Sequence, residues 1–97
     1  EILERDINKL ENTLHYKEFR QTFRKLASTY HPDKGGNATA FRMIKDIYEF
    51  QADILKTSEE ALSGLNLKEE DYINITLASL KAKKAVAKAA DFFGGRR

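Results

Sequence analysis

The residues best suited to chemistry in this chain are His31 and Asp33, which flank Pro32. An imidazole and a carboxylate at this spacing could transfer protons or bind a metal ion. General acid–base catalysis is disfavoured because neither a nucleophile nor a set of oxyanion donors accompanies the pair. The other histidine, His15, is distant in sequence and the chain has no cysteine, so the residues predict no metal site and no cofactor. Taken without its surroundings, His31 could equally be a surface histidine at the end of a helix.

A helix is predicted over residues 16–30, directly before this tripeptide. At about 100° per residue, its apolar side chains fall within roughly a third of the helix circumference. They are Tyr16, Phe19, Phe23, Leu26, Ala27 and Tyr30. The opposite side carries four cations, which we call the basic stripe: Lys17, Arg20, Arg24 and Lys25. One face of this helix is therefore expected to enter a core, and the other to stay in solvent.

A tight reversal and a second helix are predicted after the tripeptide. Pro32 disfavours the helical conformation at the residue before it and lacks a backbone donor, so it ends the first helix. The double glycine at residues 35–36 permits positive φ angles, and Asn37 is a good N-cap for a helix over residues 38–55. Two helices joined by so short a loop must pack antiparallel. Their expected core aromatics are Phe19, Phe23, Tyr30, Phe41 and Tyr48.

Residues 7–55 closely resemble the J domain, the co-chaperone module of the DnaJ family. The resemblance rests on residues 19–30 leading into the His-Pro-Asp tripeptide, and on Phe41, Ile44 and Tyr48 of the second helix. The sequence of residues 31–36 is the short-loop version of the motif, similar to that of mitochondrial import-motor and polyomavirus T-antigen J domains. The chain departs from the pattern at Gln21 and Thr29, where many members carry lysine, and it lacks the Leu-Gly signature after the first helix.

The resemblance implies a helical hairpin crossed by an N-terminal helix. Together with the helical pattern of the residues that follow, it predicts an all-α fold with a C-terminal helical extension. It also implies that the chain is not an enzyme, but binds a DnaK-type (70-kDa heat-shock) chaperone and stimulates its hydrolysis of ATP. Asp33 would pair with a basic residue of the chaperone, while His31 and Pro32 would hold the tip in shape. The basic stripe would steer the module onto an acidic surface. The residues implied to bind the partner are His31, Pro32, Asp33, Lys34, Lys17, Arg20, Arg24 and Lys25.

The remaining segments are assigned by periodicity and by helix start and stop signals. Residues 1–56 are expected to form the J domain, with a first helix running from Ile2 or Leu3 towards Leu14. Residues 57–97 are expected to form the extension. It would consist of a short helix over residues 57–63, stopped by Gly64, and a long Ala/Lys-rich helix starting near residue 66. That long helix carries an apolar stripe, which could fold back on the hairpin or bind another protein: Ile73, Leu77, Leu80 and Ala87.

Composition is that of a small globular domain. Of the 97 residues, 41% are hydrophobic and 33% are charged, and no apolar run is long enough to cross a membrane. Residues 1–80 carry a net charge of −3, whereas residues 81–97 carry +5. The pair Phe92-Phe93 in this basic tail is expected to dock, either within the chain or onto a partner. We expect an intracellular location, in the cytoplasm or an organelle matrix.

Two other functions remain as alternatives to the co-chaperone. The first is a J-like assembly module that binds a partner protein through its C-terminal helix. The second is a nucleic-acid-associated protein, which would use the basic tail. The tail lacks the interleaved aromatics of a nucleic-acid platform, so this alternative is disfavoured.

Overall fold

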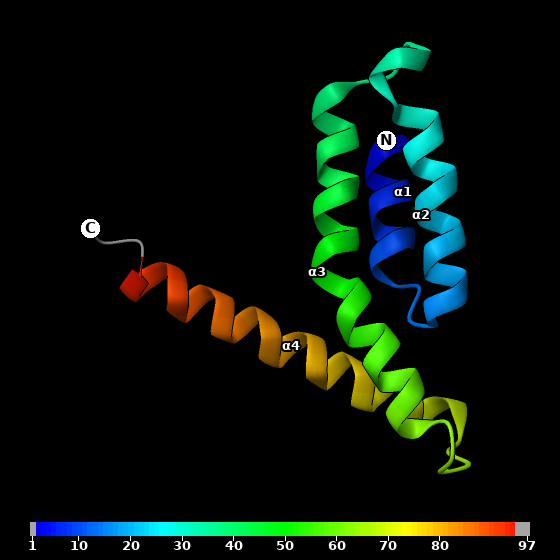
Figure 1. The fold of residues 1–97 in the computed structure, drawn as a ribbon, viewed down its shortest axis with the longest axis vertical. Helices are drawn as coiled ribbons and strands as arrows, with labels where there is room; N and C mark the ends of the chain where they lie inside the picture. Colours follow the sequence, from blue (N-terminus) through cyan, green and yellow to red (C-terminus); the bar gives the residue numbers. More distant parts are fainter. Residues whose placement is uncertain (1, 95–97) are drawn as a thin grey trace.

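Every regular element in the part of the chain that the computed structural model describes is a helix, which confirms the predicted all-α class (Figure 1). The structure describes the backbone of residues 2–94 and the side chains of residues 3–90. The elements in chain order are α1 (Ile2–Glu11), α2 (Tyr16–Tyr30), the short 3-10 helix η1 (Pro32–Lys34), α3 (Ala38–Leu62) and α4 (Glu69–Gly94). No helix in the described part of the chain combines the length and apolarity that a membrane span requires.

The predicted hairpin is present: α2 and α3 lie antiparallel and pack along their apolar faces (Figure 1). Phe19 and Ile44 are fully buried between them. The ring of Tyr48 stacks on two aromatic rings of α2, with centroids 5.6 Å from Phe19 and 4.1 Å from Phe23. Of the five predicted core aromatics, Phe19 is thus fully buried, whereas the other four are half-buried.

The predicted crossing of the hairpin by the first helix is wrong: α1 runs along the hairpin in the same direction as α3, contacts both α2 and α3, and ends at Glu11, before Leu14 (Figure 1). Leu10 at its end is fully buried, and Leu14 in the following loop is 5% exposed. The Tyr30 hydroxyl donates a hydrogen bond of 2.7 Å to the Asp6 carboxylate, which ties the end of α2 to α1. This bond to a carboxylate raises the pKa of the Tyr30 phenol above its usual value of 10.

The predicted short helix at residues 57–63 is wrong as a separate element, because α3 continues without a break to Leu62. The residues that look like a new helix start are its last turns. Ser58 lies one helical turn beyond the fully buried Leu55 and is itself buried. Glu59 accepts a hydrogen bond of 2.8 Å from the backbone N–H of Tyr16, which is a free donor in the first turn of α2. These tertiary contacts stabilise an unbroken α3 more than a local capping box would stabilise a new helix that begins at residue 57.

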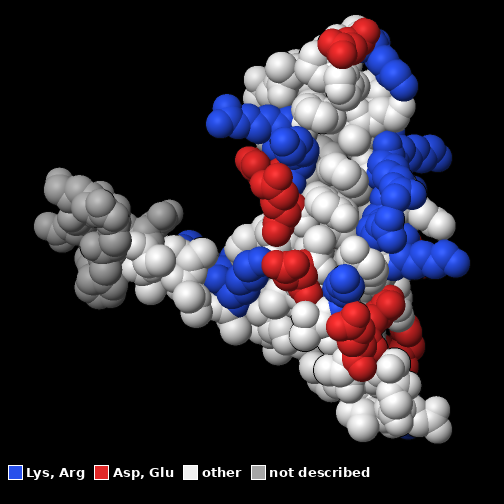
Figure 2. Space-filling model, in the orientation of Figure 1, with Lys and Arg blue, Asp and Glu red and all other residues white. Residues whose placement is uncertain are grey.

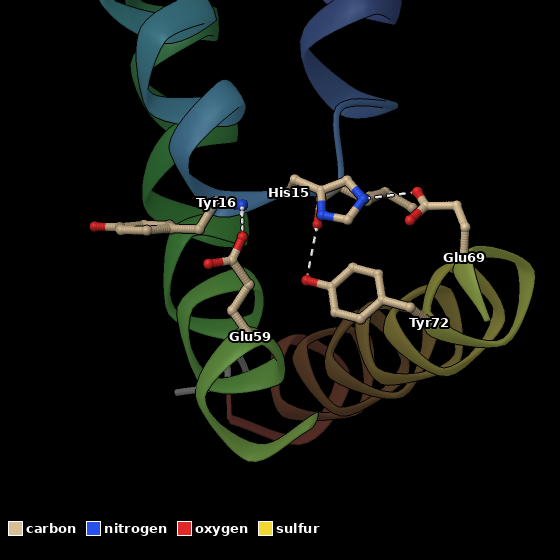
Figure 3. A network of polar contacts seen from close by, with 6 residues as sticks. His15, Tyr16, Glu59, Glu69 and Tyr72 are labelled. Atoms are coloured by element: carbon tan, nitrogen blue, oxygen red, sulfur yellow. Dashed lines mark hydrogen bonds and ion pairs between the residues drawn. The ribbon is translucent and has the colours of Figure 1, made fainter. Parts of the chain in front are cut away.

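The long helix α4 begins at Glu69, and the left-handed residue before it is Asn66, with φ 57°, rather than the predicted stop Gly64. Figure 3 shows the contacts that join its first turns to the loop between α1 and α2. The Tyr72 hydroxyl donates a hydrogen bond of 3.2 Å to the carbonyl of Leu14. The ring of Tyr72 stacks on the imidazole of His15, with centroids 4.8 Å apart. The imidazole of His15 lies 2.6 Å from the carboxylate of Glu69.

Part of the apolar stripe predicted for α4 packs on the body of the protein, since Leu80 is buried and Ile73 is half-buried against the core. Tyr72, Thr76 and Leu80 are the buried residues, whereas Leu77 is 42% exposed and Ala87 is exposed. The ammonium group of Lys83 donates a hydrogen bond of 2.6 Å to the carbonyl of Phe50 on α3. Lys83 is half-buried by this contact, and residues 84–90 are all exposed. The first half of α4 folds back on the body of the protein and the second half leads away from it (Figure 1).

Candidate functional site

The tip of the hairpin is a compact turn closed by backbone hydrogen bonds. His31 leaves the helical conformation, with ψ 131°, and Pro32 starts the single turn of η1. The carbonyl of His31 accepts from the N–H groups of Lys34 and Gly36, each at 3.0 Å. Gly35 follows in the left-handed region with φ 79°, and its N–H donates to the carbonyl of Pro32 at 3.1 Å. The turn therefore has a single defined backbone path.

The side chain of His31 holds this turn from within. Its Nδ1 accepts a hydrogen bond of 3.1 Å from the N–H of Asp33. The ring packs edge-on against Phe41 of α3, with centroids 4.9 Å apart. The imidazole thus connects the residue that follows the proline to the first turn of α3, and it remains 42% exposed.

The carboxylate of Asp33 is the most available group of the tip. Its side chain is 90% exposed, and among the described residues the one basic group within 4 Å of the carboxylate is Nδ1 of His31, at 3.9 Å. Lys34, next in the chain, is directed back by a hydrogen bond of 3.0 Å from its ammonium group to the hydroxyl of Ser28. The tip therefore presents a carboxylate to solvent while its neighbouring cation is held against α2.

The basic stripe lies along α2, on the side of the molecule that Figure 2 shows lined with Lys and Arg side chains. Lys17, Arg24 and Lys25 are exposed, and Arg20 is half-buried with its guanidinium 5.7 Å from the centroid of the Tyr16 ring. Among the described residues, none of the four cations is paired with a carboxylate within 4 Å. From Lys17 to Arg24 the stripe spans about 10 Å along the helix.

The structure therefore brings the predicted site residues together on one hairpin. Four form the basic stripe on α2 and the other four, residues 31–34, form the tip at its end. His15, weighed as a second metal ligand, lies at the opposite end of α2 from His31. No group of three or more potential metal ligands occurs in the described part of the chain. The arrangement suits recognition of a surface that carries both signs of charge.

Two residues support the tip in ways that helix periodicity does not reveal. Phe41, which periodicity assigns to the core, also supports the imidazole of His31. Gly36 has no positive φ, but its Cα faces the end of α2 so closely that a Cβ would lie 2.3 Å from the carbonyl carbon and oxygen of Tyr30. The double glycine predicts the turn, and the structure shows a different reason for each glycine. Gly35 adopts a positive φ, whereas Gly36 leaves room for the backbone of Tyr30.

We expect Gly36→Ala to distort the tip, because the added methyl group overlaps backbone atoms that cannot rotate away. The substitution should lower the free energy of unfolding by about 1–3 kcal/mol, the usual cost of overpacking. Gly64→Ala is the matched control, since a Cβ at that position meets nothing within 4 Å and its φ is not positive. It should be neutral or stabilise by about 0.4–1 kcal/mol. Urea denaturation measures both, and equal effects of the two would contradict the tight contact at Gly36.

Scans of the chain against protein-family models, curated proteins and solved structures find no match.

Proposed function

We propose that this chain is a J-domain-type co-chaperone that binds a DnaK-type chaperone and stimulates its hydrolysis of ATP. The chain would supply no catalytic group of its own, and would act by favouring the state of the chaperone in which hydrolysis occurs. The proposal is supported by the resemblance of residues 7–55 to J domains and by the exposure of the residues that the resemblance implicates. Its single strongest support is Asp33, a 90% exposed carboxylate on a turn that His31 braces.

The division of charge along the hairpin suggests how binding would proceed. The basic stripe is unpaired by carboxylates in the described structure, so it would attract an acidic surface over a distance of about one Debye length, near 10 Å at 0.1 M salt. Asp33, at the end of the same hairpin, would then meet a cation. A rigid tip lowers the entropy cost of that second contact, because Asp33 does not have to be ordered on binding.

The stimulation would follow from differential binding. A module that binds two states of the chaperone equally shifts nothing, however tightly it binds. Each tenfold shift towards the hydrolysis-competent state requires about 1.4 kcal/mol of preference for that state. One charge-assisted contact at Asp33, worth about 1.5–3 kcal/mol, is of the size needed for a shift of about ten- to a hundredfold.

Single-turnover hydrolysis of ATP by a DnaK-type chaperone tests the proposal. The rate is measured with and without the chain, using chaperones from several compartments. We expect the rate to rise and to saturate with the concentration of the chain. An unchanged rate with every chaperone would contradict the proposal.

Reversal of one cation of the basic stripe, Arg24→Glu, should weaken stimulation chiefly by slowing association. The matched control is Lys45→Glu, which makes the same change in net charge at an exposed position on α3. We expect the association rate with the chaperone to fall about tenfold for Arg24→Glu at low salt, and to change little for Lys45→Glu. Stopped-flow measurements over a range of salt concentrations give both rates. Equal slowing by the two variants would indicate a net-charge effect instead of a specific surface.

A second candidate, an assembly module acting through α4, is favoured by the apolar side chains that this helix leaves in solvent. Ile75 and Leu77 are each 42% exposed and Val86 is 68% exposed. Such a module would bind a partner protein while leaving the hydrolysis of ATP unchanged, so the same single-turnover assay separates the two candidates.

A further inference from the structure

An apolar seam runs along the contact between α1 and α3, on a different face from the basic stripe. Two shallow grooves of about 250 Å³ each follow it, one lined by Leu3, Ile7 and Met43 and the next by Ile47 and Phe50. These side chains recur at helical spacing on parallel helices, so the grooves lie one after the other. Met43 is 43% exposed although it is apolar.

The charged residues along this seam are mostly acidic. Glu4, Glu11 and Asp46 line the two grooves, together with a single cation, Lys84 of α4. The seam therefore suits a segment that is both apolar and basic. Burial of a large apolar side chain in such a groove is favourable, and flanking cations add attraction from the acidic rim.

The chain itself contains a segment of this description at its C-terminal end. Residues 88–97 include adjacent aromatics, Phe92 and Phe93, together with three cations and a single carboxylate. The side chains of residues 91–97 lie outside the described ones. The hairpin site of the proposed function does not use this segment, and the first half of α4 does not need it for packing.

This segment cannot reach the seam of its own molecule while α4 remains helical. Lys84 lies at the end of the seam, and α4 continues from there as one helix to Gly94. Phe92 is eight residues beyond Lys84, which places its backbone about 12 Å further along the helix. The helix leads away from α1 and α3 (Figure 1). A second molecule has no such restriction, because its α4 can approach the seam from outside.

We propose that two copies of this chain associate by exchanging their C-terminal segments, with residues 88–97 of each copy docked in the α1–α3 seam of the other. Reciprocal docking is closed and two-fold symmetric, which is the commonest form of association between identical chains. The occupant is a second copy because the acidic, apolar seam and the basic, aromatic segment occur in the same chain. The association leaves the tip and the basic stripe free.

Sedimentation velocity of the full chain tests the association. Concentrations from about 1 to 200 µM are needed because an interface built on two shallow grooves is weak. We expect the mass to rise from 11.1 kDa to twice that value. Met43→Glu places a charge in the seam and should raise the dissociation constant at least about tenfold. Leu77→Glu is the matched control: Leu77 has nearly the same exposure as Met43 but lies on α4, away from the seam. It should leave the dissociation constant within about twofold of the original.

A mixing experiment tests the exchange itself. Phe92→Ser combined with Phe93→Ser removes the segment's aromatics but keeps the seam, whereas Met43→Glu disrupts the seam but keeps the segment. In a 15N-labelled double-serine chain, the amide signals of Ile7 and Ile47 should shift when unlabelled Met43→Glu chain is added, and not when unlabelled double-serine chain is added. A wild-type chain that stays monomeric, a Met43→Glu chain that associates normally, or signals that do not shift would each overturn the proposal. Circular dichroism verifies that each variant is folded.

Discussion

A chain carrying His31→Gln is expected to fold normally and to lose its stimulation of ATP hydrolysis by a DnaK-type chaperone. The imidazole accepts from the N–H of Asp33 and packs against Phe41, and a flexible glutamine reproduces neither contact in a defined geometry. Asp33 would then have to be ordered during binding. Stability should change by less than about 1 kcal/mol, because the side chain is 42% exposed and its hydrogen bond lies in solvent.

The measurement is single-turnover hydrolysis of ATP with each variant, alongside thermal unfolding of the isolated chain. His31→Asn is an informative second variant, because its Oδ1 can occupy the place of Nδ1 and accept from the N–H of Asp33, while the contact with Phe41 is lost. We expect it to retain part of the stimulation. Full stimulation by His31→Gln would refute the role assigned to the tip, and a large loss of thermal stability would attribute the effect to unfolding.

Phe19→Ala is expected to be the most destabilising single truncation in the hairpin. Phe19 is fully buried, stacks on Tyr48, and belongs to the core that α1, α2 and α3 share with Leu80 of α4. Truncation of a buried phenylalanine to alanine removes its transfer free energy and leaves a cavity, at a cost of about 3–5 kcal/mol. Domains of this kind have only about 5–15 kcal/mol of stability, so the variant should be close to unfolding.

Urea denaturation monitored by circular dichroism measures this loss. Val86→Ala is the control, because it also removes apolar atoms but from a side chain that is 68% exposed on the free half of α4. Its effect should stay within about 0.5 kcal/mol. A loss below about 1 kcal/mol for Phe19→Ala would mean that the shared core does not hold the hairpin together.

The tip is the part of the molecule that local sequence determines. Pro32 ends α2, and Gly35 takes the left-handed conformation. The side chain of Asn37 caps α3 by accepting a hydrogen bond of 3.1 Å from the N–H of Ala40. Each of these contacts joins residues at most a few positions apart, so their geometry follows from residue type and spacing. The partner of the tip stays a prediction, since it depends on a second molecule.

The path of the chain after α3 shows where local signals are insufficient. Residues 57–60 have the pattern of a helix start, yet they continue α3 because Ser58 is buried and Glu59 caps α2 from a distance. Similarly, periodicity alone places Leu77 on the packing face of α4, whereas Thr76 occupies it. A rotation of a helix by a single residue moves its contact face by about 100°.

Sequence by itself thus determined the helical class, the antiparallel hairpin and the make-up of its tip and basic stripe, because these depend on periodicity, proline, glycine and capping within short stretches of chain. Tertiary structure alone decided the length of α3, the face of α4 that is buried and the apolar seam between α1 and α3. These features depend on contacts between residues far apart in the chain, whose free energies exceed the small preferences that local sequence expresses.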